Sequence, residues 1–244
     1  MKRSDPGRIL GLLWGTTTPA PNRGPRPKLT VEQIVQAGID VADHDGLENL
    51  SMRRVADHLN VGTMSLYTYV PGRAELLHLM LDRALGETPP LPEGTGWREA
   101  LRTYSRMARD LAIRHPWTAQ ASGPGLLLMG PNTTARSEAV YAALAPLDLT
   151  AREKFGIAGT LDGYVRGLSQ SAADVEADTR ASDVDYEKWW SEATPHLENL
   201  VTRERFPHLN DMWETGVFEE CLENTFDFGL ERILDGIQHY LDTR

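Results

Sequence analysis

Residues 50–73, LSMRRVADHLNVGTMSLYTYVPGR, contain two short helical patterns on either side of a sharp turn, which limits the folds open to the chain. Ser51 suits the N-cap of the first helix, because its hydroxyl can accept a hydrogen bond from a free backbone N–H. Asn60-Val61-Gly62 breaks the pattern, since asparagine and glycine tolerate a left-handed backbone. A second helix is expected over 63–70, ended by Pro71. The stretch predicts a helix-turn-helix; an ordinary helical hairpin in an all-α core is the alternative.

The second helix presents two different faces. At about 100° per residue, Leu66 and Val70 share one side, which is expected to be buried. Four residues spread over the other side: Met64, Ser65, Tyr67 and Thr68. Hydroxyls and a methyl group suit base edges in a major groove, and tyrosines can reach phosphate oxygens. This outward face favours DNA recognition.

Flanking helices complete the predicted domain. Thr30 and Gln33 have the spacing of a capping box, so a first helix begins there and stops at Gly46. A fourth helix is expected over 72–85. It ends before the proline-rich segment 88–92, which is the clearest domain boundary in the chain.

Residues 28–87 resemble the DNA-binding domain of the tetracycline-repressor family, on the segments LSMRRVA and SLYTYVPGRAELL. The resemblance implies a repressor that binds a near-palindromic operator as a homodimer and releases it when a small molecule binds. It also implies which residues contact bases: Arg53, Thr63, Met64, Ser65 and Thr68. Phosphate contacts are implied for Lys28, Tyr67, Tyr69 and Arg73. A helix-turn-helix activator, or an architectural DNA-binding protein without an inducer, is the alternative.

The charge is unevenly distributed. The net charge is −10, but residues 1–84 carry ten lysines and arginines against nine acids, and the remainder carries fifteen against twenty-six. Residues 1–27 are rich in proline and glycine and are expected to form a flexible basic arm. Arg23 and Arg26, next to Lys28, suit a minor groove beside the helix-turn-helix. A disordered tail is the alternative, and in either case loss of residues 1–24 is expected to leave folding unaffected.

The composition excludes several classes of protein. No apolar run approaches the about 20 residues of a membrane span, so a cytoplasmic protein is expected. The lone Cys221 rules out an internal disulfide and a cysteine-based zinc cluster. His115 near Asp110, and the acids of 176–187, come without a nucleophile, a metal-binding spacing or a cofactor loop. We therefore expect neither an enzyme nor a cofactor.

Residues 88–244 are expected to form a second, helical domain that binds ligand and dimerises. Helical periodicity is found throughout, and we expect five or six helices. The clearest of them cover 97–115, 132–144 with Asn132 as the cap, 150–176 and 215–241. The short apolar run 126–129 is expected to be a bend or a broken helix.

Two of these helices carry a candidate dimer interface. Four glycines fall on one stripe of the helix 150–176: Gly156, Gly159, Gly163 and Gly167. Each costs a helix about 1 kcal/mol relative to alanine, so something is expected to pack closely against them, either within the monomer or across a dimer. The segments LDGYVRGLSQ and FDFGLERILDGI resemble the helices that pair across the dimer in the same family. This resemblance implies contacts by Phe218, Leu222, Phe226, Leu230, Ile233 and Ile237.

A ligand cavity is expected between the helices of the second domain. Alignment with the family's helical pattern implies seven residues in or beside it: Tyr104, Ala108, Trp117, Ser122, Tyr164, Leu168 and Ser171. The implied ligand is a mostly hydrophobic molecule with a few polar groups. Packing in the core is the alternative role for any one of these side chains.

Overall fold

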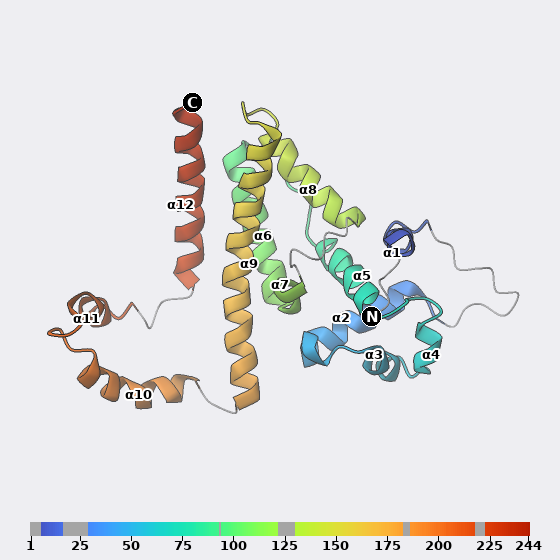
Figure 1. Cartoon of the computed structure of the whole chain (residues 1–244), viewed down its shortest axis with the longest axis horizontal. Helices are drawn as coiled ribbons and strands as arrows, with labels where there is room; N and C mark the ends of the chain where they lie inside the picture. The colour runs from blue at the N-terminus through green and yellow to red at the C-terminus, as the bar shows by residue number, and fades with distance from the viewer. Residues whose placement is uncertain (1–5, 17–28, 93, 122–129, 183–185, 218–222) are drawn as a thin grey trace, which may run out of the picture. The chain divides into compact units, whose positions relative to one another are not determined.

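The computed structural model describes residues 6–16, 29–92, 94–121, 130–182, 186–217 and 223–244, and all regular secondary structure among them is helical (Figure 1). The elements are α1 (Pro6–Leu13), α2 (Val31–Asp45), η1 (Leu47–Asn49), α3 (Met52–His58), α4 (Thr63–Leu66), α5 (Arg73–Leu85), α6 (Trp97–Arg114), α7 (Trp117–Ala121), α8 (Pro131–Leu144), α9 (Ala151–Ser182), α10 (Tyr186–Leu200), α11 (Pro207–Glu214) and α12 (Glu223–Asp242). The chain forms two compact units, residues 1–170 and 171–244, which divide within α9.

The predicted capping signals are present. The Thr30 hydroxyl accepts from the Gln33 N–H and the Gln33 side chain accepts from the Thr30 N–H, so the capping box of α2 is confirmed. Ser51 caps α3 by accepting from the Arg54 N–H. Gly46 ends α2 with a positive φ of 85°, which explains glycine at this position. The start of the helix-turn-helix is therefore fixed by local hydrogen bonds.

The turn and the second helix of the motif differ in how well they were predicted. Asn60 has a positive φ of 53°, as expected for a sharp turn. The helix was predicted over 63–70, but α4 covers only Thr63–Leu66 and is followed by turns. Threonine and valine are weak helix formers, and Pro71 restricts the backbone of Val70, so the helix ends early.

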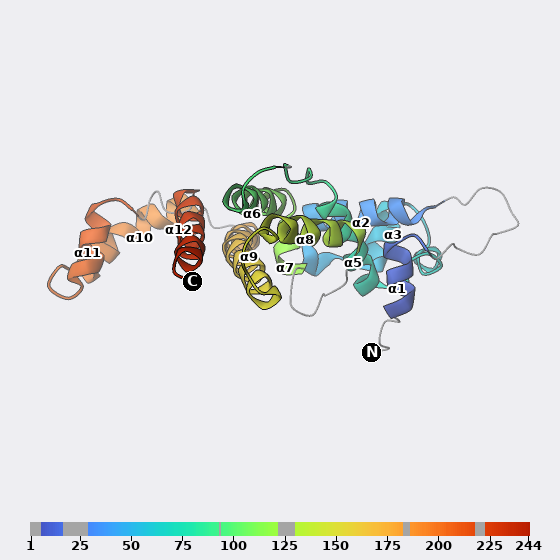
Figure 2. The ribbon, with the colours of Figure 1, turned by 90° about the horizontal axis from the view of Figure 1, so that it is seen from above.

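The N-terminal segment is more structured than expected. Residues 6–13 form α1, which lies beside α5 in both views of the chain (Figure 2). Ile9 is only 1% exposed, and Leu12 and Leu13 pack against the main core. Removing residues 1–24 would uncover this part of α5, so a loss of stability is now expected from the deletion.

Helices α2 to α5 and the helices that follow them share one hydrophobic core. Residues of α2 to α5 form most of it, and Leu111, Trp117 and Ala121 from α6 and α7 belong to the same cluster. The boundary predicted at residue 88 therefore separates two parts of the sequence, but the hydrophobic core continues across it. Displacement of α6 or α7 can be transmitted to the helix-turn-helix through these contacts.

The start of α8 is held by α5. The N-cap is Gly130 and Pro131 occupies the first turn, so Asn132 is not the cap that was predicted. The Asn132 side chain instead donates to the backbone and side chain of Asp82. Asp82 also accepts from the backbone and hydroxyl of Thr133, both at 2.9 Å. A carboxylate of α5 thus satisfies the free N–H groups of another helix.

The second unit contains α10, α11, α12 and the end of α9. The ranges of α10 and α11 had not been predicted, and α12 begins at Glu223 in the described residues, whereas a helix from 215 was expected. Phe226, Leu230 and Leu234 are at most 2% exposed. The predicted bend at 126–129 lies outside the described residues.

Candidate DNA-binding surface and ligand cavity

The outward face of α4 is exposed, as the two-face pattern predicted. Met64 is 79% exposed and Tyr67 is 41% exposed, whereas Leu66 and Val70 are fully buried. An unbranched apolar side chain so exposed at the start of a short helix has no packing role in the monomer. Ser65 and Thr68 are exposed beside it.

The other predicted DNA contacts are less uniform. Arg53 is exposed, and its side chain lies 3.9 Å from the carboxylate of Asp57 in a loose surface pair. Thr63, the first residue of α4, is half-buried. Arg23, Arg26 and Lys28 lie outside the described residues.

Two predicted phosphate contacts have structural roles in the monomer. Arg73 donates from Nε to the carbonyl of Leu50 and from one terminal nitrogen to the carbonyl of Leu47, both at 2.7 Å. These bonds fix the entry to α3. Tyr69 is half-buried and packs against the core, so its ring helps to hold α4 in place.

A cavity of about 260 Å³ lies between α5, α6, α8 and the first part of α9; we call it the α9 cavity. Tyr104 and Ala108 line it, as the resemblance implied. Its apolar lining comes from Leu81, Leu85, Leu111 and Val165. A second cavity of about 550 Å³, the linker cavity, lies between residues 88–92 and 94–95, α6 and α8, and Tyr104 lines this one as well.

Four further predicted ligand contacts that the structure describes do not line either cavity. Trp117 is 2% exposed and its indole N–H donates to Asp43 at 2.7 Å, so it belongs to the core. Tyr164, Leu168 and Ser171 lie on α9 away from both linings. Helical spacing alone had not fixed which face of α9 would be turned to the cavity. Ser122 lies outside the described residues.

The polar wall of the α9 cavity was not predicted. The Tyr104 hydroxyl donates to Asp162 at 2.7 Å, and the guanidinium of Arg136 lies 4.8 Å from the centre of the Tyr104 ring. Burial, reinforced by the Asp162 carboxylate, raises the pKa of Tyr104, so the phenol is neutral and acts as a donor. The buried hydroxyl oxygen of Ser169 has no hydrogen-bond partner among the described residues and also lines this cavity. A polar ligand group fits this wall.

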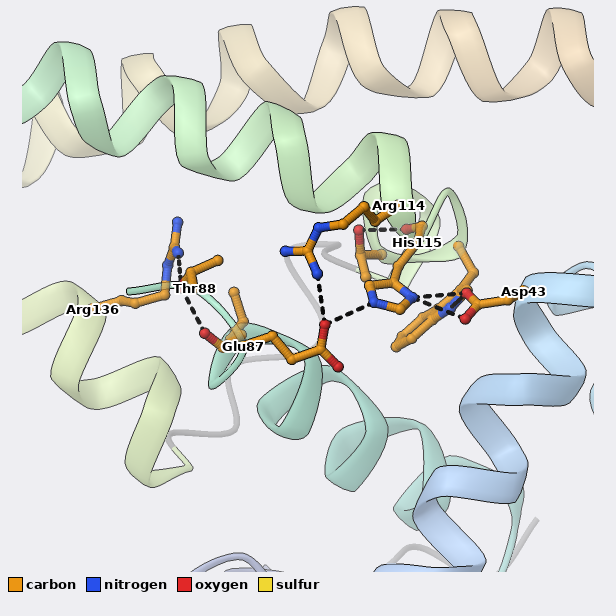
Figure 3. Close-up of polar contacts among 9 residues, drawn as sticks. Asp43, Glu87, Thr88, Arg114, His115 and Arg136 are labelled. Carbon is orange, nitrogen blue, oxygen red and sulfur yellow. Dashed lines mark hydrogen bonds and ion pairs between the residues drawn. The ribbon is translucent and has the colours of Figure 1, made fainter. Parts of the chain in front are cut away.

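A polar cluster joins α2, the end of α5 and the end of α6 (Figure 3). His115 is 9% exposed, and its two ring nitrogens lie 2.9 Å from Asp43 and 3.0 Å from Glu87. Arg114 makes a second bond to Glu87 at 2.8 Å, and Trp117 makes one to Asp43. We call these five residues the His115 cluster.

The electrostatics of the His115 cluster favour a charged imidazole. Burial opposes the charge, but the hydrogen bonds to Asp43 and Glu87 outweigh it and raise the pKa of His115. Burial likewise opposes ionisation of Glu87, yet the bonds from His115 and Arg114 lower its pKa. The cluster therefore favours the cationic form of the imidazole, which lies between two carboxylates. No local pattern predicts this cluster, because His115 and Asp43 are 72 residues apart.

The predicted dimer residues fall into two groups. Gly156, Gly159, Gly163 and Gly167 are exposed, and a methyl group added at any of them would meet no atom within 4 Å among the described residues. On α12, Phe226, Leu230 and Ile237 are buried and Ile233 is half-buried, whereas Phe228 is 65% exposed. Phe218 and Leu222 lie outside the described residues.

The described residues lack two further kinds of feature, a metal site and a membrane span. They contain no group of three or more histidine, cysteine or acidic side chains placed to hold a metal ion. None of their helices is both long and apolar enough to cross a membrane.

An exposed helix-turn-helix that shares its core with a helical body containing a cavity defines a class of DNA-binding transcriptional regulators. A family model described as "Tetracyclin repressor-like, C-terminal domain" matches residues 88–241. The chain is 41% identical over 237 residues to the HTH-type transcriptional repressor DrrR1 of Streptomyces coeruleorubidus, covering 96% of this chain and 86% of the relative. It is 36% identical over 178 residues to an HTH-type transcriptional regulator of Saccharopolyspora erythraea, covering 70% and 74%. The chain therefore belongs to the tetracycline-repressor family of transcriptional repressors.

Solved structures agree with this assignment. The Streptomyces coelicolor protein ActR in complex with actinorhodin superposes with a TM-score of 0.73 at 25% identity, covering 88% of this chain and 97% of ActR. ActR without ligand gives a TM-score of 0.65 at 26% identity, covering 87% and 96%. The fold of both domains is thus the fold of this family.

Proposed function

We propose that this repressor binds a near-palindromic operator as a homodimer and is released when a small, largely hydrophobic molecule occupies the α9 cavity. The observation that carries the proposal is the shared core, in which helices that line the cavity also support the helix-turn-helix. The ligand complex of ActR supports it, because a structural neighbour holds a small molecule. Since operator DNA is its target, the proposed place of action is the cytoplasm.

Selection of bound fragments from random DNA tests the operator part of the proposal. A near-palindromic sequence with two half-sites about one helical turn or more apart is expected. The two DNA-binding domains of the proposed homodimer would be related by a two-fold axis, and each would bind one half-site. Enrichment of a single half-site, or of no sequence, would contradict it. Release of the selected operator by candidate small molecules then tests the ligand part, and release is the feature that separates an inducible repressor from an architectural protein.

The proposed DNA contacts can be tested at α4. Tyr67→Phe is expected to lower operator affinity about fivefold to tenfold, because a single hydrogen bond to phosphate is lost. The loss should be similar for all operator sequences, since a phosphate contact does not read bases. Fluorescence anisotropy with a labelled operator measures it. Tyr141→Phe on α8 is the matched control and should bind normally; equal affinity of the two variants would remove Tyr67 from the interface.

The proposed homodimer can be tested at the glycine stripe of α9. Gly163→Leu is expected to separate two closely packed helices and to yield monomers at micromolar concentration. The exposed Phe155, on the same helix as the stripe, offers apolar surface of the kind that such an interface needs. Ala151→Leu, exposed on the same helix but off the stripe, should remain dimeric in analytical ultracentrifugation. A dimer that survives Gly163→Leu places the interface elsewhere.

A further inference from the structure

Tyr104 and Arg136 form a wall shared by the α9 cavity and the linker cavity. Arg136 comes from α8 and stacks on the ring of Tyr104, which comes from α6. A guanidinium facing two mostly apolar spaces carries a desolvation cost unless something there binds it. Its position therefore requires a partner for the charge.

The bonds of Arg136 lead to the end of α5. One terminal nitrogen donates to the hydroxyl of Thr88 at 2.7 Å, and that hydroxyl donates to the carbonyl of Leu85 at 2.7 Å (Figure 3). A hydrogen-bonded chain thus runs from the cavity wall to the last turn of the helix that packs against α2. A paired contact with an acidic group that takes two of the five guanidinium N–H donors, including one on the nitrogen bound to Thr88, competes with this bond.

The charge around the α9 cavity favours an anionic ligand group. Arg136 and Arg166 line the cavity against the single carboxylate of Asp162. Asp162 already accepts a hydrogen bond from Tyr104. Paired hydrogen bonds from a guanidinium to a carboxylate or another acidic oxygen are stronger than a single bond to a neutral hydroxyl. An acidic ligand oxygen would therefore compete successfully with Thr88.

We propose that Arg136 is the ligand-sensing residue: it selects molecules that carry an acidic oxygen on an aromatic or aliphatic frame, and it leaves Thr88 to bind that oxygen. The proposal rests on the proposed function, in that the ligand occupies the α9 cavity. Loss of the bond to Thr88 removes a link between α8 and the segment that follows α5. Because α5 packs on α2, this change reaches the DNA-binding domain.

The selectivity of Arg136 can be measured with two matched fluorescent probes, 8-anilinonaphthalene-1-sulfonate and the uncharged N-phenyl-1-naphthylamine. Arg136→Gln in the full chain is expected to weaken the anion about tenfold or more and to change the neutral probe less than about twofold. Arg136→Lys should recover part of the anion's affinity. Ala108→Trp should exclude both probes, which places them in the α9 cavity. Equal losses for the two probes, or no loss for the anion, would overturn the proposal.

The coupling through Thr88 is tested by adding the selected operator. In the wild-type protein the operator duplex should weaken binding of the anionic probe. In Thr88→Val this effect should fall about threefold or more, because the bond from Arg136 to the Thr88 hydroxyl, through which ligand and DNA compete, is absent. Thr103→Val on α6 is the control and should behave as wild type. An operator effect unchanged by Thr88→Val overturns the sensing role. A protein that selects no operator refutes the proposed function, whereas one that binds operator but takes up both probes regardless of Arg136 refutes only the role of Arg136.

Discussion

Asp82→Ala is expected to destabilise the protein by about 2–4 kcal/mol, because several buried donors lose their charged acceptor at once. The Asp82 carboxylate is 6% exposed and accepts from the backbone N–H groups of Asn132 and Thr133. It also accepts from the side chains of both residues. No other described carboxylate joins α5 to the start of α8 in this way.

Urea denaturation followed by circular dichroism measures this effect. Asp57→Ala, on an exposed part of α3, is the control and should change stability by less than about 0.5 kcal/mol. Gly130→Ala should also destabilise, since its added methyl group would lie 2.3 Å from the Asp82 carboxylate. An Asp82→Ala protein as stable as the Asp57→Ala control would show that α8 starts independently of α5.

The His115 cluster is expected to make stability depend on pH. The folded-state pKa of His115 is raised above 6.5, so its contribution is fully present below pH 6.5 and is lost as the pH rises through the folded-state value. The folded-state pKa of Glu87 is lowered below 4.5, so its contribution is present above pH 4.5 and is lost as the pH falls through the folded-state value. The cluster therefore stabilises the protein most between these two transitions.

Comparison of the wild type with His115→Gln from about pH 5 to about pH 9 tests this expectation. At the acidic end the variant should be less stable by about 1–3 kcal/mol, a range that allows for the partial exposure of Asp43 and Glu87. The difference should shrink toward the alkaline end, where the imidazole is neutral in both states. His239→Gln, at an exposed position of α12, serves as the control. A difference that stays constant with pH would mean that His115 acts only by packing.

Local signals explain what the sequence could predict. The capping box at Thr30, the cap at Ser51 and the left-handed turn at Asn60 depend on neighbours within a few residues, so the residue types alone identify them. The two faces of α4 follow from helical spacing for the same reason. The length of α4 was overestimated because the restriction by Pro71 extends back into the helix.

Contacts between distant segments could not be predicted in this way. Arg136 and Asp162 are surface types in ordinary helical patterns, and only the packing of α6, α8 and α9 brings them to one cavity wall. The network around His115 joins residues from three helices, and spacing within one helix carries no information about the other two. The alignment on the family's helices gave Tyr104 and Ala108 correctly as cavity residues but missed the face of α9, because a cavity has no motif.

The short length of α4 limits how the operator sequence and the repressor can evolve together. A helix of a single turn, Thr63–Leu66, has few side chains to offer to bases, so under the proposed function α4 of one protomer would distinguish only about three to four base pairs. So short a DNA sequence recurs by chance throughout a genome, which offers about 10⁶–10⁹ competing sites. For the proposed homodimer, the specificity for the operator then depends on two half-sites at a fixed spacing. A change of operator sequence must then occur in both half-sites together. The operator sequence and the surface that binds it are therefore expected to diverge slowly in evolution, whereas the cavity can change to accept new ligands.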